Sequence, residues 1–172
     1  AGKFLMGSEF TSVLGDAPDP EYFGVSKHGA NRPADFDNEI PQHKILLEKY
    51  RISKTPVTNA QYEIFTKATG YPVPGHWPEG VVTSELANHP VVYVDWADVQ
   101  SFCIWAGVEL PTEPQWERAA RGIDGRIWPW GNFPPNKELA NYGQTDKTGR
   151  TNTVGFYPAG ASPDGLLDVA GN

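Results

Sequence analysis

Residues 110–122 read Leu-Pro-Thr-Glu-Pro-Gln-Trp-Glu-Arg-Ala-Ala-Arg-Gly, and this stretch carries the signals of one complete short helix. Thr112 is followed three residues later by Gln115, the pattern of a capping box, in which two side chains satisfy backbone N–H groups of the first turn. Gly122 is the residue type that most often ends a helix. The stretch therefore predicts a helix from Thr112 to Gly122, with an inward face made of Trp116, Ala119 and Ala120.

Two further helices are predicted upstream, each with its own start and stop signal. Thr58 and Gln61 form a second capping box, and Gly70 closes that segment. Asp95 is the expected N-cap of the other helix, which ends at Gly107. Apolar spacing predicts the buried positions as Ile64, Phe65 and Ala68 in the first helix and Val99, Phe102, Cys103 and Ala106 in the second.

The rest of the chain shows little periodicity. Short strands are predicted at 3–6, 44–53 and 91–94, where apolar residues cluster or alternate. Residues 11–43 are polar and rich in Gly, Pro and Asp, which predicts a long loop. Turns and short extended pieces are predicted for 123–172. No internal repeat or clear linker interrupts the pattern, so the sequence predicts one domain.

Composition and charge narrow the possible functions. The chain has 172 residues with 39% hydrophobic content, enough for one globular core. Its formal net charge of −7 argues against nucleic acid and anionic membrane surfaces as partners, and no apolar run is long enough for a membrane span. A single cysteine, Cys103, excludes an internal disulfide. It leaves the compartment open, with the cytoplasm slightly favoured.

Seven segments in a fixed order resemble the motifs of the formylglycine-generating-enzyme-like (sulfatase-modifying factor) domain family. The most specific is 110–122, and the resemblance covers essentially the whole chain. The segments lie at 2–8, 39–43, 55–62, 90–96, 110–122, 129–132 and 168–172.

The resemblance implies an α+β domain of the complex C-type-lectin-like, formylglycine-generating-enzyme type. Such a fold has little regular secondary structure, here about three helices and short strands. It also implies that residues 1–172 form a single domain that lacks its C-terminal third. A second chain or segment is then expected to complete the domain, because a partial domain exposes apolar surface and strand edges.

The resemblance implies a structural calcium site in the turn-rich segment after residue 140. The side chains of Asn141 and Asp146 and the backbone carbonyls of Tyr142 and Thr148 would hold the ion. Calcium prefers six to eight oxygen ligands in flexible loops, and these residues supply that type of donor. The alternative is that the Asn and Asp side chains only form Asx-turns.

Half of a second calcium site is implied at 168–172. The Asp168 side chain and the Gly171 carbonyl would start this site, and its remaining ligands would follow Asn172. Calcium is thus the expected structural cofactor, and Asp168 and Gly171 join the candidate metal ligands.

The resemblance to the family's enzymes implies an oxidation reaction, but this chain alone does not contain the cysteines for it. In them a pair of C-terminal cysteines binds copper(I) and activates oxygen, and a cysteine in an unfolded sulfatase segment becomes formylglycine. Thiolates suit copper(I), but neither cysteine is present here. Cys103 lies on the predicted apolar stripe of its helix, so we expect a buried core thiol. No catalytic residue is therefore assigned within the chain.

Histidines and paired carboxylates give weaker alternatives. His28, His43, His76 and His89 lack metal-ligand spacing, and His43 is expected to form a structural hydrogen bond. Glu113 and Glu117 could do acid–base work. The favoured interpretation is that they support the helix through its dipole and ion pairs.

Three hypotheses follow for the function. The first is an oxygen-dependent oxidoreductase of the formylglycine-generating type, acting on an extended cysteine-containing peptide. The second is a non-catalytic C-type-lectin-like module that binds a ligand or another protein. The third is an accessory domain of a larger protein. Two cysteines in further sequence after Asn172 would favour the first.

Overall fold

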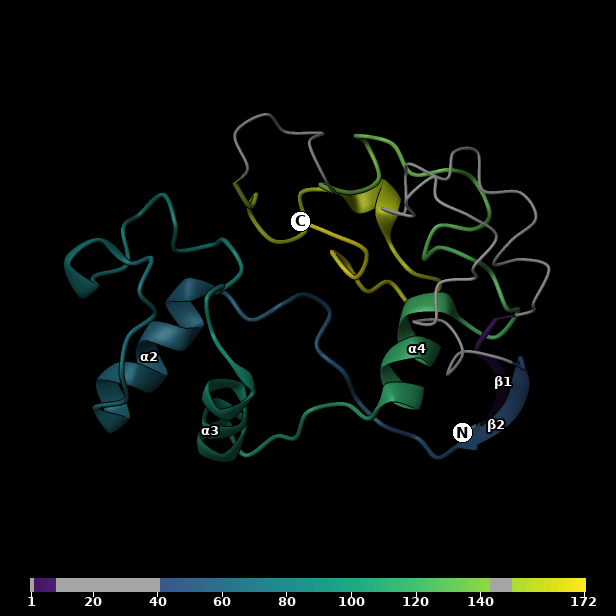
Figure 1. Ribbon diagram of the computed structural model, residues 1–172, viewed down its shortest axis with the longest axis horizontal. Helices are drawn as coiled ribbons and strands as arrows, with labels where there is room; N and C mark the ends of the chain where they lie inside the picture. Colours follow the sequence, from purple (N-terminus) through teal and green to yellow (C-terminus); the bar gives the residue numbers. More distant parts are fainter. Residues whose placement is uncertain (1, 9–40, 143–149) are drawn as a thin grey trace, which may run out of the picture.

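A computed structural model describes residues 2–8, 41–142 and 150–172 of the chain. Its helices and strands form two groups, which are visible in Figure 1. One group contains strands β1 (Gly2–Met6) and β2 (His43–Leu47) with helix α4 (Glu113–Arg121), and the other contains helices α2 (Asn59–Thr69) and α3 (Trp96–Ala106). Two 3-10 turns, η3 (Pro78–Gly80) and η4 (Pro158–Gly160), complete the regular structure of the described residues.

All three predicted helices are present, with the predicted caps. Thr58 and Thr112 each form a full capping box with the glutamine three residues later. Asp95 caps α3 and forms its own box with Asp98. The helices end next to Gly70, Gly107 and Gly122, each with a positive φ angle. The local sequence therefore predicts both ends of each helix correctly.

The strand predicted at 3–6 is confirmed as β1, whereas the other two predicted strands are shorter or absent. β1 pairs antiparallel with β2, from Gly2 opposite Leu47 to Met6 opposite His43. The expected strand over 44–53 was wrong beyond Leu47, because the ladder with β1 ends there. The expected strand at 91–94 was also wrong: Pro90 makes only an isolated bridge to Thr58, and Tyr93 has a φ of 55°, which breaks an extended run.

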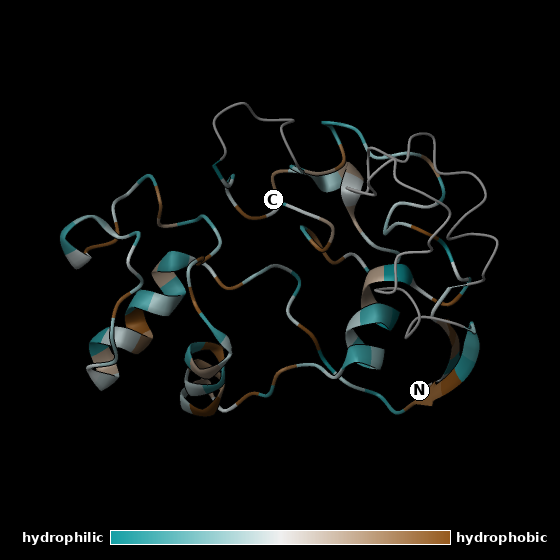
Figure 2. Cartoon of the chain, viewed as in Figure 1, coloured by the Kyte–Doolittle hydropathy of each residue, from teal (hydrophilic) through white to brown (hydrophobic). Residues whose placement is uncertain are grey.

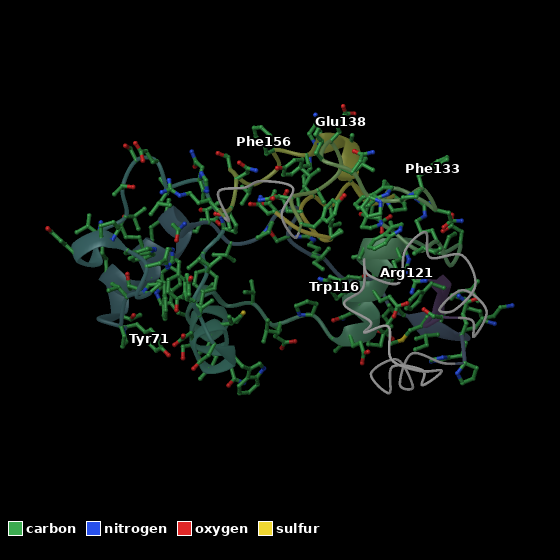
Figure 3. All side chains as sticks on the ribbon, turned by 45° about the horizontal axis from the view of Figure 1, so that its top comes forward. Tyr71, Trp116, Arg121, Phe133, Glu138 and Phe156 are labelled. Carbon is green, nitrogen blue, oxygen red and sulfur yellow. The ribbon has the colours of Figure 1, made fainter. Side chains whose placement is uncertain are left out.

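The aromatic core lies between α2, α3 and the loop that follows α2. It is centred on Tyr62, Phe65 and Trp77, and Phe102 of α3 packs against it. Tyr62 stacks on Phe102 with ring centroids 5.6 Å apart, and burial raises the pKa of Tyr62 to about 12. Tyr71 lies beside Phe65, with centroids 5.0 Å apart, at the outer end of α2 (Figure 3).

The predicted inward faces were only partly right. Phe65, Cys103, Ala119 and Ala120 are buried as expected. Ile64 is 60% exposed and Trp116 47% exposed, and Ala68 and Ala106 are also exposed. In α2 the buried face also uses Asn59, Tyr62 and Thr66, and its partners are α3 and the loop that follows α2.

α4 is tied to the end of β1 by charged hydrogen bonds. Glu117 Oε1 accepts from the Gly7 amide at 2.8 Å and from Arg121 Nη1 at 2.6 Å. Arg121 also donates to the carbonyls of Gly7 and Arg126. Trp116 and Arg121 lie on opposite sides of α4 (Figure 3). Arg121 therefore fixes this helix to Gly7, just after β1, and to the turn at Arg126.

The last described segment, 150–172, connects the two groups. Val154 donates to the carbonyl of Asn88 at 2.9 Å, beside the α2 core. Leu167 donates to the carbonyl of Lys54 at 2.8 Å, and Asp164 pairs with Arg118 of α4. Figure 2 shows that polar and apolar residues are mixed along every helix, and no helix of the described residues is long and apolar enough to cross a membrane.

Candidate functional site

The first predicted calcium site is only partly within the described residues. The side-chain nitrogen of Asn141 donates to the Arg150 carbonyl at 2.9 Å, and the Tyr142 hydroxyl donates to the Pro135 carbonyl at 3.0 Å. These bonds fix the two residues at the start of the segment. Asp146 and Thr148 lie outside the described residues, so this site stays a prediction.

Asp168, from the second predicted site, has an unusual environment. Its φ of 61° is rare for a residue other than glycine. Oδ2 accepts from the Gly155 amide at 2.6 Å. Oδ1 is buried and has no hydrogen-bond partner in the described part of the chain. A carboxylate oxygen in this situation costs free energy unless a donor or a cation meets it.

Gly171 brings the two predicted ligand sets together. A Cβ atom at Gly171 would lie 2.4 Å from the Asn141 carbonyl oxygen, so only glycine allows this approach. Gly171 also has a φ of 138°, which disfavours other residues. The backbone at Asn141, from the first set, is therefore in contact with the backbone at Gly171, from the second.

A polar triad that the sequence did not reveal supports this end of the chain. Asn172 Oδ1 accepts from the Asn152 amide at 2.7 Å, and Asn152 Nδ2 donates to the Tyr157 hydroxyl at 2.5 Å. Tyr157 is only 8% exposed. Asn172 Nδ2 is a second buried polar atom without a partner in the segments that the structure covers, and it needs an acceptor rather than a cation.

The donors at 168–172 fit a calcium ion. Within the described segments, no group of three or more His, Cys, Asp or Glu side chains could hold a metal ion. A cation here would thus be held by a mixture of carboxylate, amide and carbonyl oxygens, which is the ligand chemistry of calcium. The buried, unpartnered Oδ1 of Asp168 is the observation that favours such a ligand.

Asn59 forms a second polar centre that sequence reasoning missed. It is fully buried at the first turn of α2. Its Oδ1 accepts from Trp77 Nε1 at 2.8 Å and lies 3.1 Å from His76 Nε2. Its Nδ2 contacts the carbonyls of Leu86, His89 and Pro90 at 3.0, 3.1 and 3.3 Å. The sequence did carry one signal of this polar centre, namely a polar residue, Asn59, directly after the N-cap Thr58.

The described histidines make hydrogen bonds to protein groups. His43 Nδ1 lies 3.0 Å from the Pro41 carbonyl, which agrees with its expected structural role. His89 Nδ1 lies 3.0 Å from Thr151 Oγ1. Burial lowers the pKa of His76, whose Nδ1 has no partner among the described residues. His28 lies outside the described residues.

The chain's thiol does not fit copper(I). Cys103 is the only cysteine of the sequence, and it is buried on α3. Burial raises the pKa of this thiol, whereas copper(I) binds thiolates. The predicted core role of Cys103 is therefore confirmed, and no copper chemistry is assigned to it.

The carboxylates of α4 serve the fold. Glu117 binds the Gly7 amide and Arg121, as described above. Glu113 is exposed in the first turn, where a negative charge stabilises the helix dipole. These contacts favour the structural interpretation of the pair over acid–base work.

Comparison with known proteins gives one consistent result. The family model of the sulfatase-modifying factor enzyme 1-like domain matches residues 1–172. The hercynine oxygenase of Mycobacterium tuberculosis is 33% identical in an alignment of 181 positions, which covers 87% of this chain and 42% of that protein. The formylglycine-generating enzyme of Thermomonospora curvata is 33% identical in an alignment of 201 positions, which covers 87% of this chain and 66% of that protein. The chain thus spans less than two thirds of these relatives.

A solved structure supports the same fold. PvdO from Pseudomonas aeruginosa has a TM-score of 0.67, with 23% identity, and the match covers 100% of this chain and 65% of PvdO. At this identity the likeness concerns the fold alone. It confirms the predicted fold of the formylglycine-generating-enzyme type, with three helices, two short strands and little other regular structure.

Proposed function

Because the chain belongs to the family of the sulfatase-modifying factor enzyme 1-like domain, we propose that it forms the scaffold of an oxygen-dependent oxidoreductase. The proposed reaction is that of the formylglycine-generating type, in which a cysteine of a sulfatase-type polypeptide is oxidised to formylglycine. The observation that carries this proposal is the family match over all 172 residues, together with formylglycine-generating enzymes at 31–33% identity.

The reactive metal of this proposal needs ligands from outside these residues. Copper(I), when bound by two thiolates, supplies the activation of oxygen. The chain has one cysteine, and it is buried. We therefore assign the cysteine pair to further polypeptide, and to this chain the task of holding that polypeptide in position.

Calcium is the proposed structural cofactor. Its ligands in this chain would be the side chains of Asn141 and Asp168 and the carbonyls of Tyr142 and Gly171, with Asp146 and Thr148 completing the first site. The unpartnered oxygen of Asp168 and the contact between Gly171 and Asn141 support this assignment. A cation would tie the segment after residue 140 to the last described segment, which otherwise has little regular structure.

A second chain or segment is the proposed partner that completes the domain. Large apolar side chains lie on the surface: Tyr93 is 82% exposed, Phe133 75% and Ile104 74%. In Figure 3 Phe133 and Phe156 project from the rim of the molecule, and Phe156 is 63% exposed. Covering such side chains gains roughly 25 cal/mol per Å² of buried apolar area, which favours a partner.

A second candidate function follows from the Mycobacterium tuberculosis relative. Its name is hercynine oxygenase, and its identity of 33% equals that of the Thermomonospora curvata enzyme. The substrate of this family member is thus a small molecule, and the same scaffold would then serve a small-molecule oxygenase. A non-catalytic binding module is the remaining alternative, and the buried state of Cys103 is compatible with it.

The experiment measures oxygen consumption by the natural full-length protein with copper(I) or iron(II) supplied. A Cys-x-Pro-x-Arg peptide and hercynine are offered in separate reactions, and aldehyde formation on the peptide is followed by mass spectrometry. Copper-dependent turnover of the peptide is the expected result. Turnover of hercynine alone would replace the first proposal by the second. If neither the peptide nor hercynine is turned over, the non-catalytic binding module remains as the function.

A further inference from the structure

A cleft of about 770 Å³ lies between the end of the β1–β2 sheet, α4 and residues 164–166. One wall is the chain that leaves β2, and it includes Leu47, Lys49, Tyr50, Ile52 and Lys54. The Tyr50 hydroxyl donates to the Gln115 carbonyl at 2.7 Å, which fastens this wall to α4. The cleft contains none of the predicted calcium ligands, so it is a separate site.

The interior of the cleft is apolar. Ala119 of α4 is 1% exposed and Leu166 is 6% exposed, and both line it. Leu47 and Ile52 add two half-buried aliphatic side chains. Figure 2 colours the end of the β1–β2 sheet nearest the N-terminus in the brown of apolar residues. The interior therefore suits aliphatic side chains of a ligand.

The rim of the cleft is cationic although the chain as a whole is acidic. Lys3, Lys49 and Lys54 are exposed lining residues, and none of them makes an ion pair with any other described residue. Arg118 also lines the cleft, where Asp164 pairs with it, and the exposed Glu48 offsets one of the three lysines. Against a net charge of −7 for the chain, this local excess of positive charge favours a ligand with carboxylates.

The wall also offers backbone hydrogen-bonding groups. The ladder with β1 ends at Leu47, opposite Gly2. The backbone N–H and C=O groups of residues 49–52 form no hydrogen bonds within the described ranges. Such groups at the continuation of a strand are a template for an added extended segment.

We propose that this cleft binds an extended acidic peptide of a partner protein. Main-chain hydrogen bonds to residues 49–52 would hold the segment, an aliphatic side chain would enter the apolar interior, and carboxylates on either side would pair with the lysines. The lysines come from three separate places in the sequence: Lys3 in β1, Lys49 just after β2 and Lys54 before α2. This spacing suits several carboxylates along a chain rather than one compact anion.

The experiment uses the natural full-length protein and two fluorescent peptides. One peptide alternates aliphatic and acidic residues, and the other has lysine in place of every acid. Binding is followed by anisotropy at low and high salt, and amide hydrogen exchange of residues 49–52 is measured with and without peptide. The variant is the double charge reversal Lys49→Glu with Lys54→Glu. Lys137→Glu, an exposed loop residue outside the cleft, is the matched control.

We expect the acidic peptide to bind, to weaken with salt and to slow exchange at residues 49–52. The double reversal is expected to reduce its affinity about tenfold or more, since two attractive exposed charges become repulsive. Lys137→Glu is expected to leave the affinity unchanged. Equal binding to both variants, or equal binding of the lysine peptide, would overturn the proposal. If no peptide binds and the amides of residues 49–52 are already protected from exchange without peptide, another segment of the same protein fills the cleft, and the proposal is wrong.

Discussion

Asn59 offers the sharpest test of how the α2 group is held together. Its amide joins the first turn of α2 to Trp77 and to the carbonyls at 86–90. We expect Asn59→Ala to destabilise the protein far more than an ordinary surface change, because a fully buried polar partner is removed from other buried groups.

The magnitude follows from the individual bonds. Trp77 Nε1 has Asn59 Oδ1 as its acceptor and Trp77 is 4% exposed, so its N–H would be left buried without a partner, at about 1–3 kcal/mol. The carbonyls of Leu86 and His89 keep backbone donors, from His89 and Asn59 respectively. Loss of the Nδ2 bonds adds about 1 kcal/mol. The total of about 3 kcal/mol corresponds to a Tm lowered by about 6–12 °C for a chain of this size.

The assay is thermal and urea unfolding of the natural full-length protein, with Asn88→Ala as control. Asn88 is exposed and its side chain makes no hydrogen bond within the described residues. We expect its substitution to change stability by less than about 0.5 kcal/mol. A Tm for Asn59→Ala within about 2 °C of the control, which corresponds to about 1 kcal/mol or less, would refute the assigned role.

Three further substitutions test other parts of the structure. Asp168→Asn is expected to reduce the rise in Tm that calcium gives over EDTA, because one carboxylate ligand is lost. His76→Gln is expected to flatten the fall in stability that occurs as the pH drops below about 6.5. Burial holds the pKa of His76 below its ordinary value of 6.5, so stability is complete above that value and falls as the pH drops towards the folded pKa. Glu117→Ala is expected to cost about 2 kcal/mol in the urea-derived free energy of unfolding, since Gly7 and Arg121 lose their shared acceptor.

Two of these substitutions have a control variant within the same chain, and His76→Gln is compared with the wild type. Asp124→Asn alters an exposed carboxylate paired with Arg126 and should leave the calcium gain unchanged; an undiminished gain in Asp168→Asn would count against that ligand. Parallel pH curves for the wild type and His76→Gln would contradict the histidine assignment. Glu113→Ala removes an exposed carboxylate from the same helix, and an equal loss there would contradict the role of Glu117.

Local signals in the sequence were sufficient to place the helices. Capping boxes and terminal glycines act within a few residues, so Thr58, Asp95 and Thr112 begin their helices as predicted. The strand that begins at His43 ended early because its length depends on pairing with β1, which lies far away in the sequence, and this ladder ends with Gly2 opposite Leu47. Strand length is thus a tertiary property.

The buried faces and polar centres were harder to predict. Hydrophobicity favoured Ile64 as a core residue of α2, but this residue is exposed, and the helix buries Asn59, whose side chain hydrogen-bonds to the loop carbonyls at 86–90. The contact between Gly171 and Asn141 joins residues 30 positions apart and leaves no local pattern. The resemblance to the family indicated both as ligands, and the structure places them beside each other.

In the proposed function, this chain is the scaffold of a family oxidoreductase, and it contributes no reactive thiol. The most direct measurement is copper-dependent oxygen consumption by the natural full-length protein carrying Cys103→Ala, with a cysteine-containing peptide as substrate. Because Cys103 is buried on α3, the variant is expected to retain wild-type copper binding and turnover. Loss of copper binding and turnover in a variant that is still folded would contradict the claim.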